Sequence, residues 1–283
     1  IALLKSGEWE FTDLLRNGIV EMIGASEQNQ NIKICNFPSE VTDEYDYCEI
    51  HPSLLLGIGA STVPFSNHNP GPRVSYQGGM SKQGVGIPFT NFNQMMTGTF
   101  HILNYPQKLV PSNKILKYIH NDEQSSAVNT IVAIMPFQGF NQEDAIVINK
   151  GFIERGGLNT TMFVCYYAES KKEDGIFFEI PKREECAAYK CNKIDHLHSN
   201  GIAKVGSVIQ QNDPVICMTQ TISHHLVNKP KIDCSIYFKY RLGKIADIER
   251  GTSQSGYDYV RVKVAILMIP QIGDKLASVD GKK

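Results

Sequence analysis

Apolar runs rich in β-branched and aromatic residues constrain the fold of this chain more than any other feature. Each run is bounded by Gly, Pro, Asn or Asp, residue types that favour turns and interrupt regular structure. The pattern predicts a mixed α+β, strand-rich fold. The predicted strands cover residues 19–23, 131–137, 145–149, 160–168, 214–218, 234–240 and 257–269.

Helical patterns are fewer and shorter. Thr12 and Asp13 are residue types that cap helices, so we expect a short helix through Arg16, ended by Gly18. Between residues 91 and 103 the spacing of apolar residues predicts a second helix.

Length and charge limit the classes of protein to consider. The chain has 283 residues, enough for two domains of about 150 residues each, and 42% of its residues are hydrophobic. With 28 basic and 29 acidic residues its formal net charge is −1. A nucleic-acid site must therefore be a local basic patch. Because the chain starts at Ile1 and stops within a lysine-rich segment, we interpret it as an excised fragment.

The cysteines and the hydropathy pattern indicate an intracellular protein. Seven cysteines, an odd number scattered through apolar runs, are typical of reduced thiols. No apolar stretch approaches the roughly 20 residues that span a bilayer, so no membrane partner is expected.

A polar stretch at residues 67–83 is the first of three that carry chemistry. A Pro-Gly-Pro sequence predicts a rigid turn directly before Arg73. The planar guanidinium of a rigidly held arginine matches two phosphate oxygens. Lys82 and Gln83 follow a Gly-Gly pair and add a second cation and an uncharged donor. The simpler alternative is an ordinary surface arginine after a turn.

The second stretch places two adjacent carboxylates after a Gly-Phe-Asn-Gln sequence, at Glu143 and Asp144. Neighbouring residues on a strand point to opposite faces, so a tight acid/base pair is not expected. Mg²⁺ often takes only one or two protein carboxylates besides substrate phosphates, so the pair is a candidate magnesium site. A solvated acidic turn is the alternative.

The third stretch, residues 269–283, places Lys275 and Lys283 on a segment rich in small residues. Two lysines on one folded loop can contact neighbouring phosphates of a strand. An exposed basic tail is the alternative.

Two cysteines and two histidines between residues 186 and 198 form a further candidate metal site, but we do not expect them to bind zinc. The C-x4-C spacing is longer than that of common zinc knuckles, and His-x-His is a poor second pair. The cluster consists of Cys186, Cys191, His196 and His198.

The three polar stretches, in this order, resemble a known protein family. The resemblance includes a fourth segment at residues 48–57, with the sequence Cys-Glu-Ile-His-Pro-Ser-Leu-Leu-Leu-Gly. The chain is similar to the second-largest, beta-like subunit of multisubunit DNA-directed RNA polymerases. The similarity is to the eukaryotic, archaeal and large-DNA-virus branch, and it runs from about residue 12 to the last residue. Divergence within the family suggests a viral or extrachromosomal origin, so the protein could act in the nucleus or the cytoplasm.

The resemblance implies an arrangement of domains. Residues 1–56 correspond to the external region and residues 57–158 to the first part of the hybrid-binding domain. Residues 159–263 correspond to a β-rich wall, or flap. Residues 264–283 would return to the hybrid-binding domain, which contains a double-psi β-barrel.

It also implies roles for the site residues. Arg73 would contact the triphosphate of the incoming nucleotide, while Lys82 and Gln83 would lie along the RNA. Asp144, with Glu143, would be near the second Mg²⁺ through a weak or indirect contact. The principal Mg²⁺ ligands are expected on the largest subunit.

Lys275 and Lys283 would contact RNA phosphates near the growing 3′ end. Here the sequence departs from the family, with Val279 and Asp280 where Arg-His is usual and Lys282 where Gln or Asn is usual.

The activity implied is template-dependent nucleotidyl transfer from nucleoside triphosphates to the RNA 3′ end, within a multisubunit enzyme. Its partners would be the largest subunit, smaller polymerase subunits, the DNA template and the RNA transcript. Two alternatives remain. One is a catalytically degenerate paralogue that binds nucleic acid or polymerase subunits, and the other is a zinc-stabilised interaction module.

Overall fold

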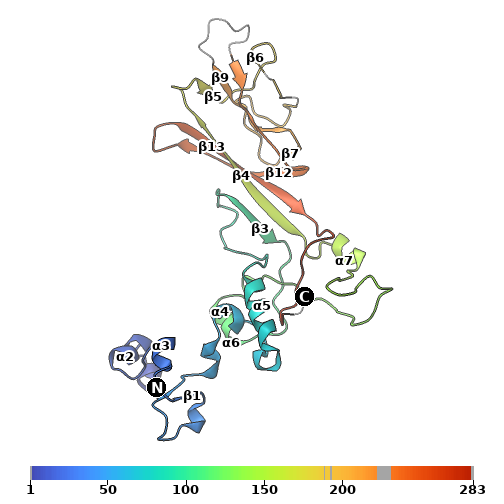
Figure 1. Cartoon of the computed structure of the whole chain (residues 1–283). Coiled ribbons are helices and arrows are strands. Elements are labelled where there is room, and N and C mark those ends of the chain that lie inside the picture. Colours follow the sequence, from blue (N-terminus) through green and yellow to red (C-terminus); the bar gives the residue numbers. More distant parts are fainter. Residues whose placement is uncertain (1, 188, 192, 222–230, 282–283) are drawn as a thin grey trace. The chain divides into compact units, whose positions relative to one another are not determined.

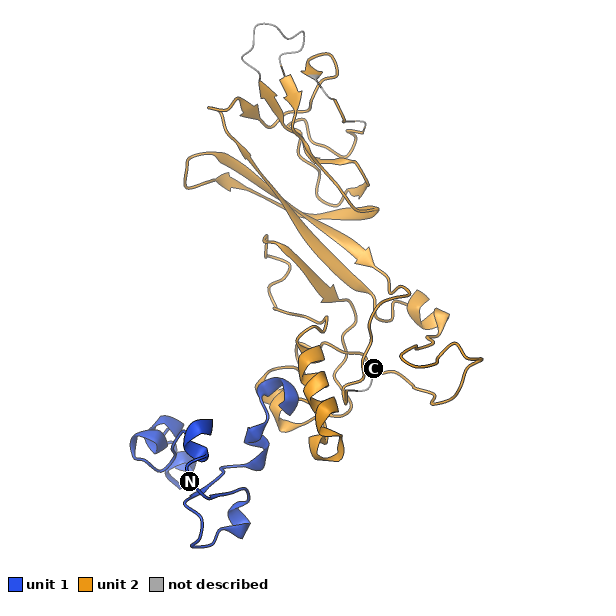
Figure 2. Ribbon diagram, in the orientation of Figure 1, with its two compact units in different colours: residues 1–61 blue, residues 62–283 orange. Residues whose placement is uncertain are grey.

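The computed structural model describes residues 2–187, 189–191, 193–221 and 231–281. The chain divides into two compact units, residues 1–61 and 62–283 (Figure 2). The fold is mixed and strand-rich, as predicted, with antiparallel pairing dominant in its larger sheets. None of the described helices is long and apolar enough to cross a membrane.

Unit 1 consists of short elements around a small interior. Of its described residues, Cys35 is the only buried hydrophobic one. A two-residue parallel pair joins β1 to β2, with Cys35 opposite Cys48. Its elements are α1 (Ala2–Ser6), α2 (Phe11–Arg16), α3 (Ala25–Gln28), β1 (Ile34–Cys35), η1 (Pro38–Glu40), β2 (Tyr47–Cys48), η2 (Pro52–Leu55) and α4 (Ile58–Ser61).

The short helix expected through Arg16 is confirmed as α2, although its cap differs. Glu10, not Thr12 or Asp13, is the N-cap, and the Glu10 N–H donates to the Asp13 side chain at 2.9 Å. The strand predicted at residues 19–23 is wrong, because that segment pairs with no strand.

Unit 2 is built on a five-stranded sheet in the order β3-β4-β13-β12-β7 (Figure 1). Smaller sheets join β5, β9, β10 and β6, and β11 with β8. Its helices are η3 (Ser66–His68), α5 (Gly71–Ser81), α6 (Lys114–Tyr118) and α7 (Lys150–Glu154). Its strands are β3 (Thr99–Leu103), β4 (Thr160–Ser170), β5 (Ile176–Phe177), β6 (Cys186–Ala187), β7 (Val208–Gln210), β8 (Pro214–Ile216), β9 (Thr219–Thr221), β10 (Lys231–Asp233), β11 (Ile236–Tyr237), β12 (Leu242–Thr252) and β13 (Asp258–Met268).

The long strands β4 and β13 confirm the predictions for residues 160–168 and 257–269. They pair antiparallel over their whole length, from Thr160 opposite Met268 to Ser170 opposite Asp258. Alternate residues of β13 face a buried cluster that also contains β8 and Phe238. The predicted strands at 214–218 and 234–240 are present as the shorter β8 and β11.

The helix predicted at residues 91–103 is wrong. Turns precede β3, which pairs with β4 so that Phe100 lies opposite Phe163. The two rings are 5.2 Å apart between centroids. Pairing and aromatic packing therefore override the local apolar spacing, as is common for strands.

The strands predicted at 131–137 and 145–149 are also wrong. Both segments run without a partner strand in the described structure, and their apolar side chains are largely exposed. Ile131 and Ile134 are 104% and 96% exposed. The sequence pattern of a strand is present, but a strand also needs a neighbour that satisfies its backbone donors and acceptors.

Lys263 is buried on the second face of the large sheet, with 1% of its surface exposed. Its Nζ donates to the carbonyls of Phe92 and Asn93 at 2.5 and 3.0 Å. The same nitrogen lies 4.7 Å from the Phe163 ring centroid. Burial lowers the pKa of this lysine. Lys263 therefore holds the segment before β3 against the sheet.

We predict that Lys263→Met loosens this segment. The variant loses hydrogen bonds to a charged group, worth about 1.5–3 kcal/mol, and leaves two carbonyls without their donor. Amide hydrogen exchange should accelerate at residues 89–98, while Lys244→Met, at an exposed lysine of β12, should not change it. Equal exchange in the two variants would contradict this role.

Asp233 organises the smaller sheets. Its carboxylate accepts from the Lys190 N–H at 3.1 Å, the Ser235 N–H at 3.0 Å and the Tyr237 hydroxyl at 2.7 Å. Burial alone would raise the pKa of Asp233, but these donors lower it below its usual value. The charged form is therefore favoured in the folded chain.

We predict a pH-dependent effect of Asp233→Asn. A carboxyl with a depressed folded-state pKa contributes stability above its unfolded pKa, about 3.9, and loses it as pH falls through the folded-state value. The urea midpoint of the variant should fall below that of the parent at pH 7, and the gap should shrink below about pH 4. A gap that is constant with pH would show that the charge is not responsible.

Candidate functional site

Arg73 lies in the first turn of α5 and not on the isolated rigid turn that the sequence predicted. Pro72 stands in that same turn, where its fixed φ suits a helix and its missing N–H costs nothing. Val74 is buried and docks the helix, whereas Arg73 is exposed. The guanidinium carbon lies 5.9 Å from the Tyr76 ring centroid.

Lys82 and Gln83 follow at the other end of α5. Lys82 is the C-cap, the Gln83 N–H donates to the Met80 carbonyl at 3.0 Å, and both side chains are exposed. At 1.5 Å per residue, Arg73 and Lys82 are about 13 Å apart along the helix axis. The two cations therefore lie at opposite ends of α5.

Glu143 and Asp144 occupy the corner of a turn. The Ala145 N–H donates to the Gln142 carbonyl at 3.0 Å, and Glu143 has a φ of 54°. Both carboxylates are exposed. The expectation that the two side chains point to opposite faces of a strand is wrong, because Glu143 and Asp144 lie in a turn and not in a strand.

Lys275 is exposed and follows a turn in which the Asp274 carboxylate accepts from the Gln271 N–H at 2.9 Å. Lys282 and Lys283 lie outside the described residues. The structure thus gives a local setting to one of the two predicted lysines.

The Val279-Asp280 sequence, where the chain departs from the family, forms the corner of a second turn. The Gly281 N–H donates to the Ser278 carbonyl at 3.2 Å. The Ser278 hydroxyl donates to the Asp280 carboxylate. Asp280 is therefore engaged within its own turn.

The Gly281 turn lies directly on α5, and Figure 1 shows the C-terminal segment returning from β13 to this helix. A Cβ on Gly281 would be 2.4 Å from the Arg73 carbonyl oxygen and 3.3 Å from Gln77 Cβ. Gly281 is buried, with a φ of 89°. The structure therefore brings together the first and third polar stretches.

The carboxylates of Glu143 and Asp144 are not bonded to the described residues of the contact between Gly281 and α5. In the described part of the chain, Glu143 and Asp144 form no ion pair with the α5 or Gly281 segments. Among the described residues, no group of three or more His, Cys, Asp or Glu is arranged to hold a metal ion.

The cysteines and histidines weighed as a zinc cluster have separate surroundings. Cys191 Sγ lies 4.0 Å from Cys217 Sγ in the buried core. His196 Nε2 is 2.7 Å from the Pro214 carbonyl oxygen, and Cys186 is buried on β6. The thiol of Cys191 and its own buried environment raise the pKa of Cys217. Cys186, Cys191 and His196 are therefore packed core residues, whereas His198 is exposed.

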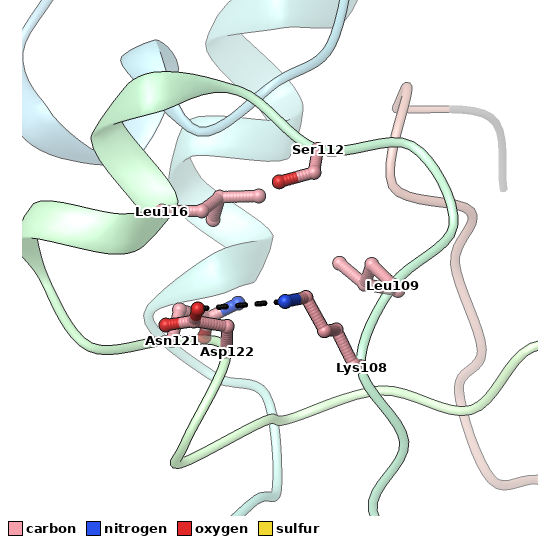
Figure 3. Close-up of a pocket in the computed structure, with 6 residues that line it drawn as sticks. All are labelled: Lys108, Leu109, Ser112, Leu116, Asn121 and Asp122. Carbon is pink, nitrogen blue, oxygen red and sulfur yellow. Dashed lines mark ion pairs between the residues drawn. The ribbon is translucent and has the colours of Figure 1, made fainter.

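The enclosed space beside α6 does not suggest a ligand site. A cavity beside α6 has a volume of about 10 Å³, and the ion pair between Lys108 Nζ and Asp122 Oδ2 crosses it at 3.6 Å (Figure 3). A volume of this size admits no more than one water molecule. The candidate site is the open surface around α5, where the first and third polar stretches meet.

From the sequence, Gly281 was only one of the small residues of the third stretch, and Gln77 was not singled out. Gln77 Oε1 is buried and has no hydrogen-bond partner among the described residues. No local sequence pattern predicts a contact between positions about two hundred residues apart. This contact depends on where the chain lies after it leaves the end of β13.

Comparison with known proteins gives the family. The family model described as RNA polymerase Rpb2, domain 6, matches residues 59–283. The DNA-directed RNA polymerase II subunit 2 of Arabidopsis thaliana is 32% identical over 289 residues, which cover 95% of this chain and 24% of the relative.

Two further relatives show similar identity. The RNA polymerase II subunit RPB2 of Encephalitozoon cuniculi is 33% identical over 302 residues, with 100% of this chain and 26% of the relative covered. The subunit Rpo2 of Sulfolobus acidocaldarius is 32% identical over 293 residues, again with 100% and 26% covered. The chain thus spans about a quarter of the length of these relatives. On the match over residues 59–283, the chain belongs to the RNA polymerase Rpb2 domain 6 family.

Proposed function

We propose that this chain is the active-site part of the beta-like subunit of a DNA-directed RNA polymerase. In the proposed reaction the RNA 3′-hydroxyl attacks the α-phosphate of a nucleoside triphosphate and pyrophosphate leaves. One observation carries the proposal: the Gly281 turn rests on the Arg73 carbonyl, so the segments that carry Arg73 and Lys275 meet although they are distant in sequence. Phosphoryl transfer depends chiefly on positioning and charge neutralisation, which such a surface supplies.

Arg73 is the proposed contact to the triphosphate. It is exposed at the first turn of α5. Its guanidinium can pair two oxygens of one phosphate.

Lys82, Gln83, Lys275 and Lys283 are the proposed RNA contacts. Lys82 and Gln83 project from the far end of α5, about 13 Å along the axis from Arg73. A nucleic-acid strand that passes from the nucleotide along the helix would therefore meet them in turn. Such an arrangement is compatible with the net charge of −1, because the cations are local.

Glu143 and Asp144 suit a weak or indirect contact to Mg²⁺. Both are exposed hard-oxygen groups at a turn, and Mg²⁺ accepts few protein ligands when phosphates and water supply the rest. When bound, the ion would neutralise phosphate charge. The principal Mg²⁺ ligands are proposed to lie on the largest subunit, which with smaller subunits, DNA and RNA completes the enzyme.

The proposed domain arrangement has support in the register of the large sheet. Thr160, at the start of β4, lies opposite Met268, at the end of β13. The chain therefore leaves and returns at one place, as expected for a wall inserted into a hybrid-binding domain. We propose residues 159–263 for the wall, with its second boundary inside β13. The hybrid-binding domain would comprise residues 57–158 and 264–283, with residues 1–56 as the external region. The exposed apolar segments around Ile131 and Ile146 are proposed to contribute to its double-psi barrel.

We predict that Arg73→Ala in the assembled polymerase raises the nucleotide KM more than it weakens retention of a preformed RNA–DNA hybrid. The expected change in kcat/KM is roughly ten- to a hundredfold, the usual effect of losing hydrogen bonds to a charged group. Lys82→Ala, at the other end of α5, is the matched control and should show the opposite balance. Unchanged nucleotide use by Arg73→Ala would refute the proposed role.

We predict that Lys275→Ala slows extension of a bound primer and flattens the salt dependence of hybrid binding. Each lost phosphate contact should remove a slope of about 0.7 on a single strand or 0.9 on a duplex. Lys244→Ala, at an exposed lysine of β12, should leave the slope unchanged. A parental slope and extension rate in Lys275→Ala would argue against an RNA contact.

Template-directed extension also separates the proposal from the degenerate-paralogue alternative. Purification of the full-length subunit with its partners, followed by an extension assay, should recover a largest subunit and RNA synthesis. A complex that binds the hybrid without extending it would favour the paralogue.

A further inference from the structure

The contact between Gly281 and α5 is tighter than a side chain allows. Ordinary van der Waals contact begins at 3.4 Å, whereas a Cβ on Gly281 would lie 2.4 Å from the Arg73 carbonyl oxygen. The neighbour is helix backbone, which cannot rotate away as a flexible side chain can. Accommodation of even a methyl group would therefore require the turn or the first turn of α5 to shift.

Three other features indicate that this contact is built and not incidental. Gly281 is buried, and its N–H closes the turn on the Ser278 carbonyl at 3.2 Å. The Ser278 hydroxyl bonds Asp280 inside the same turn. Gln77, one helical turn beyond Arg73, is buried at its Oε1 beside this joint.

We propose that Gly281 is a positioning residue for Arg73, and this inference rests on the proposed function of Arg73 as the triphosphate contact. With no side chain at position 281, the turn seats on the Arg73 carbonyl and fixes the first turn of α5. The orientation of the guanidinium then depends on the segment that carries Lys275. A misplacement of about 1 Å can cost about a hundredfold in rate when geometry is critical.

A matched control exists in the same segment. Gly273 has a φ of 104°, also in the left-handed region, but a Cβ there would meet nothing within 4 Å. Gly273→Ala and Gly281→Ala therefore impose comparable backbone strain, and only the second adds a clash with α5. The difference between the two variants isolates the contact.

The experiment uses the full-length subunit in the assembled polymerase and measures nucleotide KM, kcat and retention of a preformed hybrid. Gly281→Ala should raise the nucleotide KM about tenfold or more, and Gly273→Ala should raise it markedly less. In a double-mutant cycle, Gly281→Ala should add little to Arg73→Ala, because both act through one guanidinium. Additive effects, or equal effects of the two glycine variants, would overturn the inference.

A milder variant keeps the test decisive if Gly281→Ala fails to assemble. Asp280→Ala removes the hydrogen bond from Ser278 and adds no atoms at the contact. It should raise the nucleotide KM in the parent and not in the Arg73→Ala background, and an equal rise in both would overturn the inference. The Arg73→Ala arm reports separately on the proposed function: if it leaves nucleotide use unchanged, that function fails, whatever the cycle shows.

Discussion

The antiparallel pairing of β4 with β13 is the interaction on which unit 2 depends. Over eleven residues of each strand it sets which side chains face the core and which face outward. Val262 and Val264 are fully buried on one face, while Lys263 between them faces the other. The pairing also returns the chain to its point of departure, since Thr160 lies opposite Met268. The segment with Lys275 starts from that point.

The second face of this sheet shows why a buried cation is tolerated. Lys263 exchanges water for two carbonyl oxygens and the faces of Phe163 and Phe100. An ammonium that is taken from water needs such replacements, because an unpaired buried charge is costly. The same carbonyls belong to a segment without regular structure, so the lysine satisfies backbone groups that no strand would pair. The Lys263 side chain therefore both replaces its lost water contacts and provides a hydrogen-bond donor for two backbone carbonyls.

Local patterns predicted the long strands of this fold, and contacts between distant residues decided the rest. Long β-branched and aromatic runs bounded by turn residues identified β4 and β13. The same signal at residues 131–137 lacked a partner strand, and the apolar spacing at 91–103 gave way to pairing of β3 with β4.

For the candidate site, Arg73, Glu143 and Lys275 were predicted from residue type, but their local structural settings were not predicted. Pro-Gly-Pro suits a helix start as well as a free turn, so α5 was missed. The approach of Gly281 to Arg73 depends on tertiary structure that no local motif encodes.

The register of β13 has a consequence for insertions and deletions in this region. A one-residue slip of a strand exchanges its two faces and displaces everything after it by about 3.3 Å. Here a slip would turn Lys263 toward the valine core and move the Gly281 turn off the Arg73 carbonyl. Length changes between Asp258 and Gly281 should therefore be selected against far more strongly than substitutions on the outer face. The spacing of this stretch, more than its composition, carries information about the site.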